Sequence, residues 1–198
     1  MGRMQDFWLS DQYIDRKYEH YKQFVTYLNG TPNTLLDIGC GYAYEAGWFN
    51  EEHGTQIWLQ DANEKFDPDH PKRKRYRNWG ELHDFGGYNS FDEIRSVLSE
   101  RGITDYKLLE VNDKQWQDAP KFDVIMSVKA MGFHFPIHNF TDFIKQHSHD
   151  KTRVFVTIRH LPEGPNDTDW KYKNVVYEHG PPTKNGKRSA FVEIELDS

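Results

Sequence analysis

Apolar positions along this chain follow a helical period first and a strand period afterwards. Between residues 11 and 28, apolar and tyrosine side chains recur three or four residues apart, which places them on one face of a helix. Gly30 and Pro32 then predict its end. The positions on this face are Ile14, Tyr18, Tyr21, Val25 and Leu28.

Five short apolar runs follow, each with the length of a buried strand. The first begins at Thr34, and the others are Thr55–Gln60, Tyr106–Val111, Phe122–Val128 and Arg153–Ile158. Helical patterns separate several of them, at Tyr44–His53, after Ser90 up to Gly102, and from Pro136 through Ile144. Strands that alternate with helices predict a mostly parallel sheet, with ligands at the carboxyl ends of the strands.

The alternation stops after the fifth run. Residues 161–169 are rich in helix breakers, and two further apolar runs flank the loop 180–186, which predicts an antiparallel hairpin. The predicted organisation is one α/β domain over residues 1–198 with helices on both faces of the sheet. Its parts are an N-terminal helical cap (1–31), core βα units (34–160) and a terminal hairpin (172–196).

Composition limits the classes of protein that fit. A chain of 198 residues suits one domain, and although only 36% of residues are hydrophobic, an aromatic fraction of 15% supplies large buried area. A net charge of −6 argues against binding nucleic acid through the overall field. Cys40 is the single cysteine, which excludes an intramolecular disulfide and favours a reducing compartment, by default the cytoplasm. The sequence has no stretch of transmembrane length, and no membrane partner is expected.

The richest segment is Leu35-Leu-Asp-Ile-Gly-Cys-Gly41, a buried strand that runs into a glycine turn. Tyr44 stands where a dinucleotide-binding turn would need its third glycine, which disfavours a pyrophosphate cofactor. Asp37 beside the turn would repel phosphate but attract an ammonium or sulfonium group. S-adenosylmethionine carries both of these cations and no phosphate.

This segment resembles the first motif of class I S-adenosylmethionine-dependent methyltransferases, hydrophobic-Asp-x-Gly-x-Gly. The predicted strand order with its terminal hairpin is similar to the seven-stranded Rossmann-like fold of that family, so the resemblance extends over nearly the whole chain. One departure is the segment 161–169, where the family commonly places a helix. The resemblance implies a methyltransferase with S-adenosylmethionine as its cofactor.

The resemblance also implies which residues bind the cofactor. In the first motif these are Asp37, Gly39, Cys40 and Gly41. Asp61, at the end of the second strand, would accept hydrogen bonds from the ribose hydroxyls, unless it only caps the residues that follow. Asn112 or Asp113 would lie near the adenine amine and Trp116 could stack on the base, although Asx residues after strands are also common turn formers. The N-terminal helix would cover the amino-acid end of the cofactor with one of Tyr13, Tyr18 or Tyr21.

The segment Phe122–Pro136 resembles the fourth-strand motif and its active-site loop, which brings Lys129 and His134 near the methyl donor. Methyl transfer gains most from positioning and a dry pocket, because the sulfonium loses its charge. For a hydroxyl acceptor, His134 is the best candidate base, with packing between Phe133 and Phe135 as the alternative. The loop also resembles one in methyltransferases thought to act on sugars, so we expect a small-molecule or sugar-like hydroxyl acceptor.

Two other functions remain open from the sequence. The run 72–77 holds five cations in six residues, which fits either an RNA or DNA methyltransferase that contacts phosphates or a solvated loop. A non-catalytic S-adenosylmethionine-binding or regulatory subunit is the second alternative. We expect no metal, because His147 and His149 are too close for an i, i+4 pair and no HExxH pattern occurs.

Overall fold

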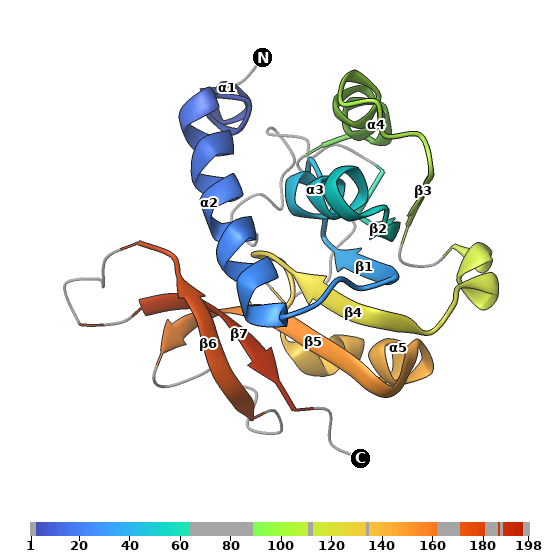
Figure 1. Cartoon of the computed structure of the whole chain (residues 1–198), viewed down its shortest axis with the longest axis vertical. Coiled ribbons are helices and arrows are strands. Elements are labelled where there is room, and N and C mark those ends of the chain that lie inside the picture. The colour runs from blue at the N-terminus through green and yellow to red at the C-terminus, as the bar shows by residue number, and fades with distance from the viewer. Residues whose placement is uncertain are drawn as a thin grey trace, which may run out of the picture.

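A computed structural model describes residues 3–63, 89–110, 113–133, 135–161, 171–180, 186 and 188–195. Within them, seven strands form one sheet in the order β3-β2-β1-β4-β5-β7-β6 (Figure 1). The strands are β1 (Thr34–Ile38), β2 (Gln56–Gln60), β3 (Tyr106–Leu109), β4 (Phe122–Ser127), β5 (Ser148–Leu161), β6 (Tyr172–Glu178) and β7 (Arg188–Ile194).

The direction of each strand decides at which edge of the sheet its carboxyl end lies. Strands β1 to β5 pair in parallel with one another, whereas β7 is antiparallel to both β5 and β6. Consequently β6 runs in the same direction as β5, and its carboxyl end lies at the same edge as the carboxyl ends of β1 and β4. The predicted mostly parallel sheet with a terminal antiparallel hairpin is confirmed.

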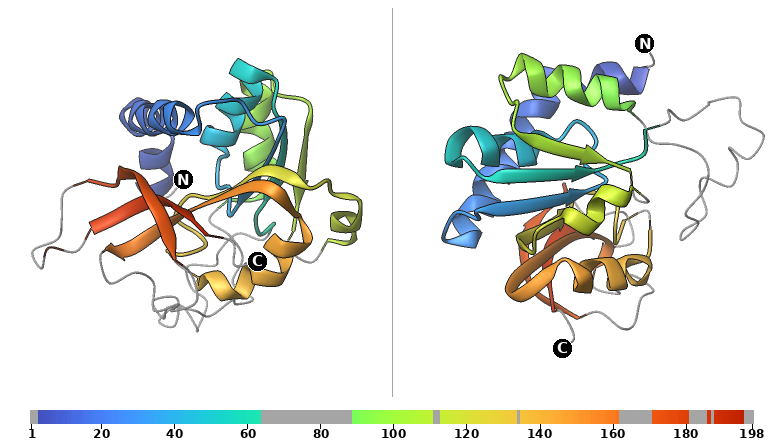
Figure 2. Two further views of the ribbon diagram at one scale, coloured as in Figure 1. Left: turned by 60° about the horizontal axis from the view of Figure 1, so that its bottom comes forward. Right: turned by 90° about the vertical axis from the view of Figure 1, so that its right-hand side faces the viewer.

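Helices cover both faces of the sheet, as predicted (Figures 1 and 2). One face carries α2 (Asp11–Leu28), α3 (Tyr44–His53) and α4 (Phe91–Glu100), and the short α1 (Arg3–Trp8) precedes α2. The other face carries the 3-10 turns η2 (Lys114–Asp118) and η3 (Ile137–Phe140) together with α5 (Thr141–Gln146). No helix among the described residues has both the length and the apolar composition to cross a membrane.

The long helix α2 has both a helical spacing of apolar residues and a capping residue at its start. The Ser10 side chain accepts a hydrogen bond from the amide of Tyr13, and Asn29 ends the helix in the left-handed conformation. Tyr21 and Phe24 are 1% exposed and pack into the core between α2, α3 and the sheet. This anchors α2 on the face of the sheet, beside α3.

Alternation along β1 fixes the direction of its acidic side chain. Leu35 packs in the core under α2 and α3, whereas Leu36 and Ile38 pack in the core on the opposite face. Because successive side chains of a strand point to opposite faces, Asp37 lies on the side of Leu35, under α2 and α3.

Strand boundaries differ from the prediction near the hairpin. β5 is longer than the predicted run and extends to Leu161, which pairs with Arg188. β6 begins at Tyr172, before the apolar run that predicted it. Backbone pairing continues across polar positions that a hydrophobic pattern does not detect. The predicted helix after Pro136 is a 3-10 turn followed by the short α5.

Candidate active site

The glycine turn after β1 requires glycine for conformation and for space. Gly39 and Gly41 have φ of +68° and +56°, in the left-handed region that side chains other than glycine rarely adopt. A Cβ placed on Gly39 would lie 2.2 Å from the Cβ of Ala130, in the loop after β4. The turn therefore packs directly against the loop that carries Lys129.

Asp61 follows β2 and is bonded to the same turn. Its Oδ2 accepts a hydrogen bond from the amide of Gly41 at 2.7 Å, and its Oδ1 accepts one from Ala62 at 2.8 Å. Burial raises the pKa of Asp61 to about 6, against the opposing effect of these two bonds. Burial also raises the pKa of the Cys40 thiol well above its usual range, which keeps it protonated.

Asp37 is a buried acid that lacks a complete set of partners. It is 2% exposed, and its Oδ1 has no hydrogen-bond partner among the residues that the structure describes. Burial and the charges of Glu45 and Asp61 raise its pKa well above the usual range, while Lys17 opposes them. A buried carboxyl in this state would be stabilised by a cation.

An ion pair between α2 and α3 lies beside Asp37. The Lys17 ammonium contacts the Glu45 carboxylate, with side chains 11% and 5% exposed. The charges of both residues act on the hydroxyl of Tyr13, one turn earlier on α2. The sequence analysis did not find this pair, although Lys17 stands on the apolar face of α2, three residues after Ile14, and a lysine in that position was the available signal.

The structure distinguishes the three tyrosines predicted to cover the cofactor. The hydroxyls of Tyr18 and Tyr21 donate to the carboxylate of Glu52 at 2.9 and 3.0 Å, at the far end of α3. Tyr13 instead lies with the ion pair near Asp37, and its ring meets that of Tyr44 with centroids 6.4 Å apart. Of the three predicted tyrosines, Tyr13 is therefore the one that lies with the ion pair beside Asp37.

Lys129 follows β4 in a strained conformation. Its φ is +69°, and the next residue, Ala130, packs on Gly39. The side chain is half-buried, and burial together with the charges of Lys17 and Arg16 lowers its pKa. The structure thus brings the predicted Lys129 to the glycine turn.

Two histidines that the sequence analysis did not select, His20 and His179, lie in the same region. Together with Asp37, Lys17, Glu45 and Lys129 they form the ionisable cluster. The ring of His20, on α2, stacks on Tyr177 at 4.4 Å and meets His179 edge-on at 5.3 Å. The Nε2 of His179 lies 3.2 Å from the hydroxyl oxygen of Thr157 on β5. Burial and neighbouring cations lower the pKa of His20 to about 4 and that of His179 to about 2, so both imidazoles are neutral at pH 7.

The residues after β3 have structural partners. Asp113 caps η2 by accepting a hydrogen bond from Gln115, and its predicted role near adenine remains a prediction. Trp116 is 6% exposed, packs edge-on against Phe143, and donates from its indole nitrogen to the Glu110 carbonyl. The interpretation of Trp116 as a platform for a base is therefore wrong. Three other predicted elements, Asn112, His134 and the basic run 72–77, lie outside the described residues.

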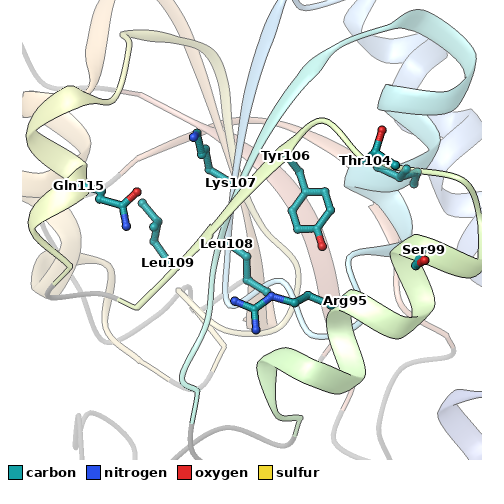
Figure 3. Close-up of a pocket in the computed structure, with 9 residues that line it drawn as sticks. Arg95, Ser99, Thr104, Tyr106, Lys107, Leu108, Leu109 and Gln115 are labelled. Atoms are coloured by element: carbon teal, nitrogen blue, oxygen red, sulfur yellow. The ribbon is translucent and has the colours of Figure 1, made fainter.

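A hollow of about 510 Å³ lies between α4 and β3 (Figure 3). Its lining includes Arg95, Tyr106 and Gln115 but none of the predicted site residues. It follows the outer strand of the sheet, whereas the ionisable cluster lies at the carboxyl ends of β1, β4, β5 and β6. The cluster, with its buried charges, is the stronger candidate for chemistry.

Comparison with known proteins shows the fold. No family model matches the sequence, and neither does any curated protein. Among solved structures, the ribosomal protein L11 methylase from Lactobacillus delbrueckii subsp. bulgaricus is similar at 12% identity and a TM-score of 0.56, over 92% of this chain and 79% of that one. The precorrin-6y C5,15-methyltransferase from Geobacter metallireducens GS-15 is similar at 13% identity and a TM-score of 0.55, over 96% and 90%.

A third similar structure is a variant of MtNAS in complex with S-adenosylmethionine, at 13% identity and a TM-score of 0.53, over 98% of this chain and 70% of that one. At such identities the likeness concerns architecture. The predicted resemblance to class I methyltransferases is thereby confirmed at the level of the fold.

Proposed function

We propose that this chain binds S-adenosylmethionine at the carboxyl ends of β1 and β2 and transfers its methyl group to a small-molecule or sugar-like hydroxyl acceptor. One observation carries the proposal: Asp37 is buried immediately before the glycine turn, with one carboxyl oxygen unpartnered among the described residues. A bound cation would supply the missing partner and would favour the ionised carboxylate.

The charge balance around the turn supports a cationic ligand over a phosphate. The charges of Glu45 and Asp61 both act on Asp37, and the Lys17 ammonium is already paired with Glu45. A pyrophosphate placed here would meet two further acids. The ammonium and sulfonium groups of S-adenosylmethionine would instead offset them.

Asp61 is suited to hold ribose hydroxyls. A carboxylate can accept about four hydrogen bonds, and the amides of Gly41 and Ala62 use two of these positions while the Cys40 thiol donates a long, weak bond at 3.9 Å to a third. The remaining position, and the one that the thiol holds weakly, are available to two neighbouring hydroxyl donors. The two amides also orient the carboxylate before any ligand arrives, which reduces the ordering cost of binding.

When bound, S-adenosylmethionine supplies a methyl carbon that accepts an electron pair from the acceptor oxygen while the carbon–sulfur pair returns to sulfur. The chain's part is to hold the two reactants in line and to exclude water. Helix α2 lies on the face of the sheet that also carries α3 (Figures 1 and 2). The hydroxyl proton needs a base, and His134 remains the predicted one.

The similar structures support the same proposal. Two of them are named as a methylase and a methyltransferase, and the third is a complex with S-adenosylmethionine. All three share the sheet whose carboxyl edge carries Asp37 and Asp61 here.

Calorimetric titration tests the proposal. We expect S-adenosylmethionine and S-adenosylhomocysteine to bind the wild-type protein, and Asp37→Asn to weaken S-adenosylmethionine binding by about tenfold, the cost of one charged interaction. Asp105→Asn, an exposed acid on another loop, is the matched control and should leave both affinities unchanged. A preferential loss of S-adenosylmethionine would show that Asp37 faces the sulfonium, and an equal loss of both ligands would show that it faces the ammonium. Absence of binding to either ligand would overturn the proposal.

A further inference from the structure

Two cations, Lys129 after β4 and Arg16 on α2, lack a carboxylate partner in the described part of the chain. Lys129 forms no ion pair there, and the acid that acts on it at longer range, Glu45, is already paired with Lys17. Arg16, on the exposed side of α2, holds its guanidinium over the rings of Tyr13 and Phe7 at 5.6 and 6.0 Å, with no acid among the described residues. Stacking of this kind leaves the guanidinium hydrogens available to a ligand.

Geometry links Arg16 to the loop of Lys129 through the two histidines. His20 follows Arg16 by one turn of α2 and meets His179 edge-on at 5.3 Å. His179 in turn lies 3.2 Å from the hydroxyl oxygen of Thr157, the residue against which Gly132 of that loop packs. The charge of Arg16 lowers the pKa of Lys129, of His20 and of His179, so the four groups lie within electrostatic reach of one another. Arg16 and His20 are four residues apart on α2 and share a face of that helix.

The loop after β4 holds Lys129 between the turn and β5. On one side, Ala130 packs on Gly39. On the other, Gly132 lies so close to β5 that a Cβ there would be 2.9 Å from the Thr157 carbonyl oxygen. The hydroxyl of Thr157 is also the partner of His179, so this loop borders both the glycine turn and the histidine pair.

Backbone strain at Lys129 also indicates a binding role for this residue. A left-handed conformation costs a residue with a side chain about 1–2 kcal/mol, and such strain concentrates at binding and catalytic sites. Glycine would avoid this cost, yet the position carries a long cation.

We propose that Arg16 and Lys129 form a subsite for a carboxylate or phosphate group, with the imidazoles of His20 and His179 as its hydrogen-bonding wall. The inference rests on the proposed function and deepens it. The anionic group belongs either to the methyl acceptor or to the amino-acid end of the cofactor, two sources that share one chemistry.

Titrations with two nucleosides separate these sources. S-adenosylhomocysteine carries the carboxylate, and 5′-methylthioadenosine lacks the whole amino-acid end. If the subsite holds the cofactor carboxylate, Lys129→Met and Arg16→Met each weaken S-adenosylhomocysteine by about tenfold or more and leave 5′-methylthioadenosine unchanged. Lys22→Met, on the same helix, and Arg95→Met, whose guanidinium lies 5.5 Å from the Phe91 ring, are matched controls that should bind both ligands normally.

If the subsite holds the acceptor, both variants keep wild-type affinity for S-adenosylhomocysteine. Inorganic phosphate, added at constant ionic strength, then binds the wild-type S-adenosylhomocysteine complex and binds the two variants about tenfold more weakly or not at all. Lys129→Gly removes the charge and the strain together, and it gives the same readout if the methionine variant folds poorly.

The inference is overturned if both variants bind S-adenosylhomocysteine normally and phosphate does not bind the wild-type complex. In that case, binding of 5′-methylthioadenosine to the wild-type protein shows that the proposed function survives. Failure of the wild-type protein to bind either nucleoside would instead remove the proposed function.

Discussion

The amide of Gly41 donates a 2.7 Å hydrogen bond to Oδ2 of Asp61. The two residues end consecutive parallel strands, so one bond joins the glycine turn to the acid proposed to hold the ribose. A change in either residue therefore alters the geometry of both.

The affinity for S-adenosylmethionine should fall in acid because Asp61 becomes protonated. With a pKa raised by burial to about 6, about a tenth of Asp61 is ionised at pH 5, so we expect affinity to fall about tenfold relative to neutral pH. Asp61→Asn should bind weakly with no such decline, as measured by calorimetry across this range.

Protonation of Asp61 does not itself unfold the protein. The folded-state pKa of Asp61 lies above its ordinary value of 3.8, so protonation of this group as the pH falls towards 4 favours the folded state. The buried, neutral imidazoles of His20 and His179 act in the opposite direction, because their pKa values of about 4 and about 2 lie below the ordinary 6.5. Circular dichroism at pH 5 is therefore the control that separates loss of binding from unfolding. A steep decline that persists in Asp61→Asn would assign the pH dependence to another group.

Gly39→Ala should destabilise the protein by about 3 kcal/mol, because the new methyl group clashes with Ala130 in addition to the strain of a positive φ. Urea denaturation measures this. Gly54→Ala is the matched control, since Gly54 has φ +67° but no atom within 4 Å of the added carbon, so it incurs only the backbone cost. Equal losses in the two variants would mean that the loop after β4 yields to the methyl group.

Lys129→Gly should stabilise the fold by about 0.5–1 kcal/mol, the strain relieved less the entropy of the added glycine, while it removes the anion subsite. Chemical denaturation and phosphate titration give the two readouts. Asn29→Gly relaxes another positive φ, at the end of α2, and should leave ligand binding intact. A destabilised Lys129→Gly would show that the lysine side chain makes contacts that outweigh its strain.

Lys17→Met should cost about 3–5 kcal/mol, because it leaves the buried Glu45 carboxylate without its cation and beside Asp37. The double variant Lys17→Met/Glu45→Met should recover most of this loss, which a double-mutant cycle in urea measures. Arg188→Met, from an ion pair with side chains 50% and 40% exposed, should cost less than about 1 kcal/mol. A double variant as unstable as the single one would contradict the assignment.

The sequence predicted those parts of the site that depend on one βα unit. The glycine turn, Asp37 and Asp61 follow from strand ends and their spacing, and a hydrophobic pattern detects strand ends well. Lys17 with Glu45, and His20 with His179, are instead brought together by the packing of α2 on α3 and β6. No local pattern encodes that packing.

Trp116 is a residue for which the sequence suggested a role that the structure does not support. An aromatic residue soon after a strand gives the same sequence signal whether it stacks on a base or fills the core. Its burial depends on Phe143, from α5, whose ring meets it at 5.0 Å. A residue pattern close to β3 could not reveal this.

The packing of α2 also determines when during folding the site is completed. The Tyr27 hydroxyl donates to Glu193 across 166 residues of sequence, and the ring of Phe24 meets that of Phe191 on β7 at 5.1 Å. Contacts of such long sequence separation form slowly, because a large loop must close first. On a ribosome, a nascent chain that lacks β7 could already form the glycine turn and its bond to Asp61. The wall of His20 and His179 must wait for the final strand.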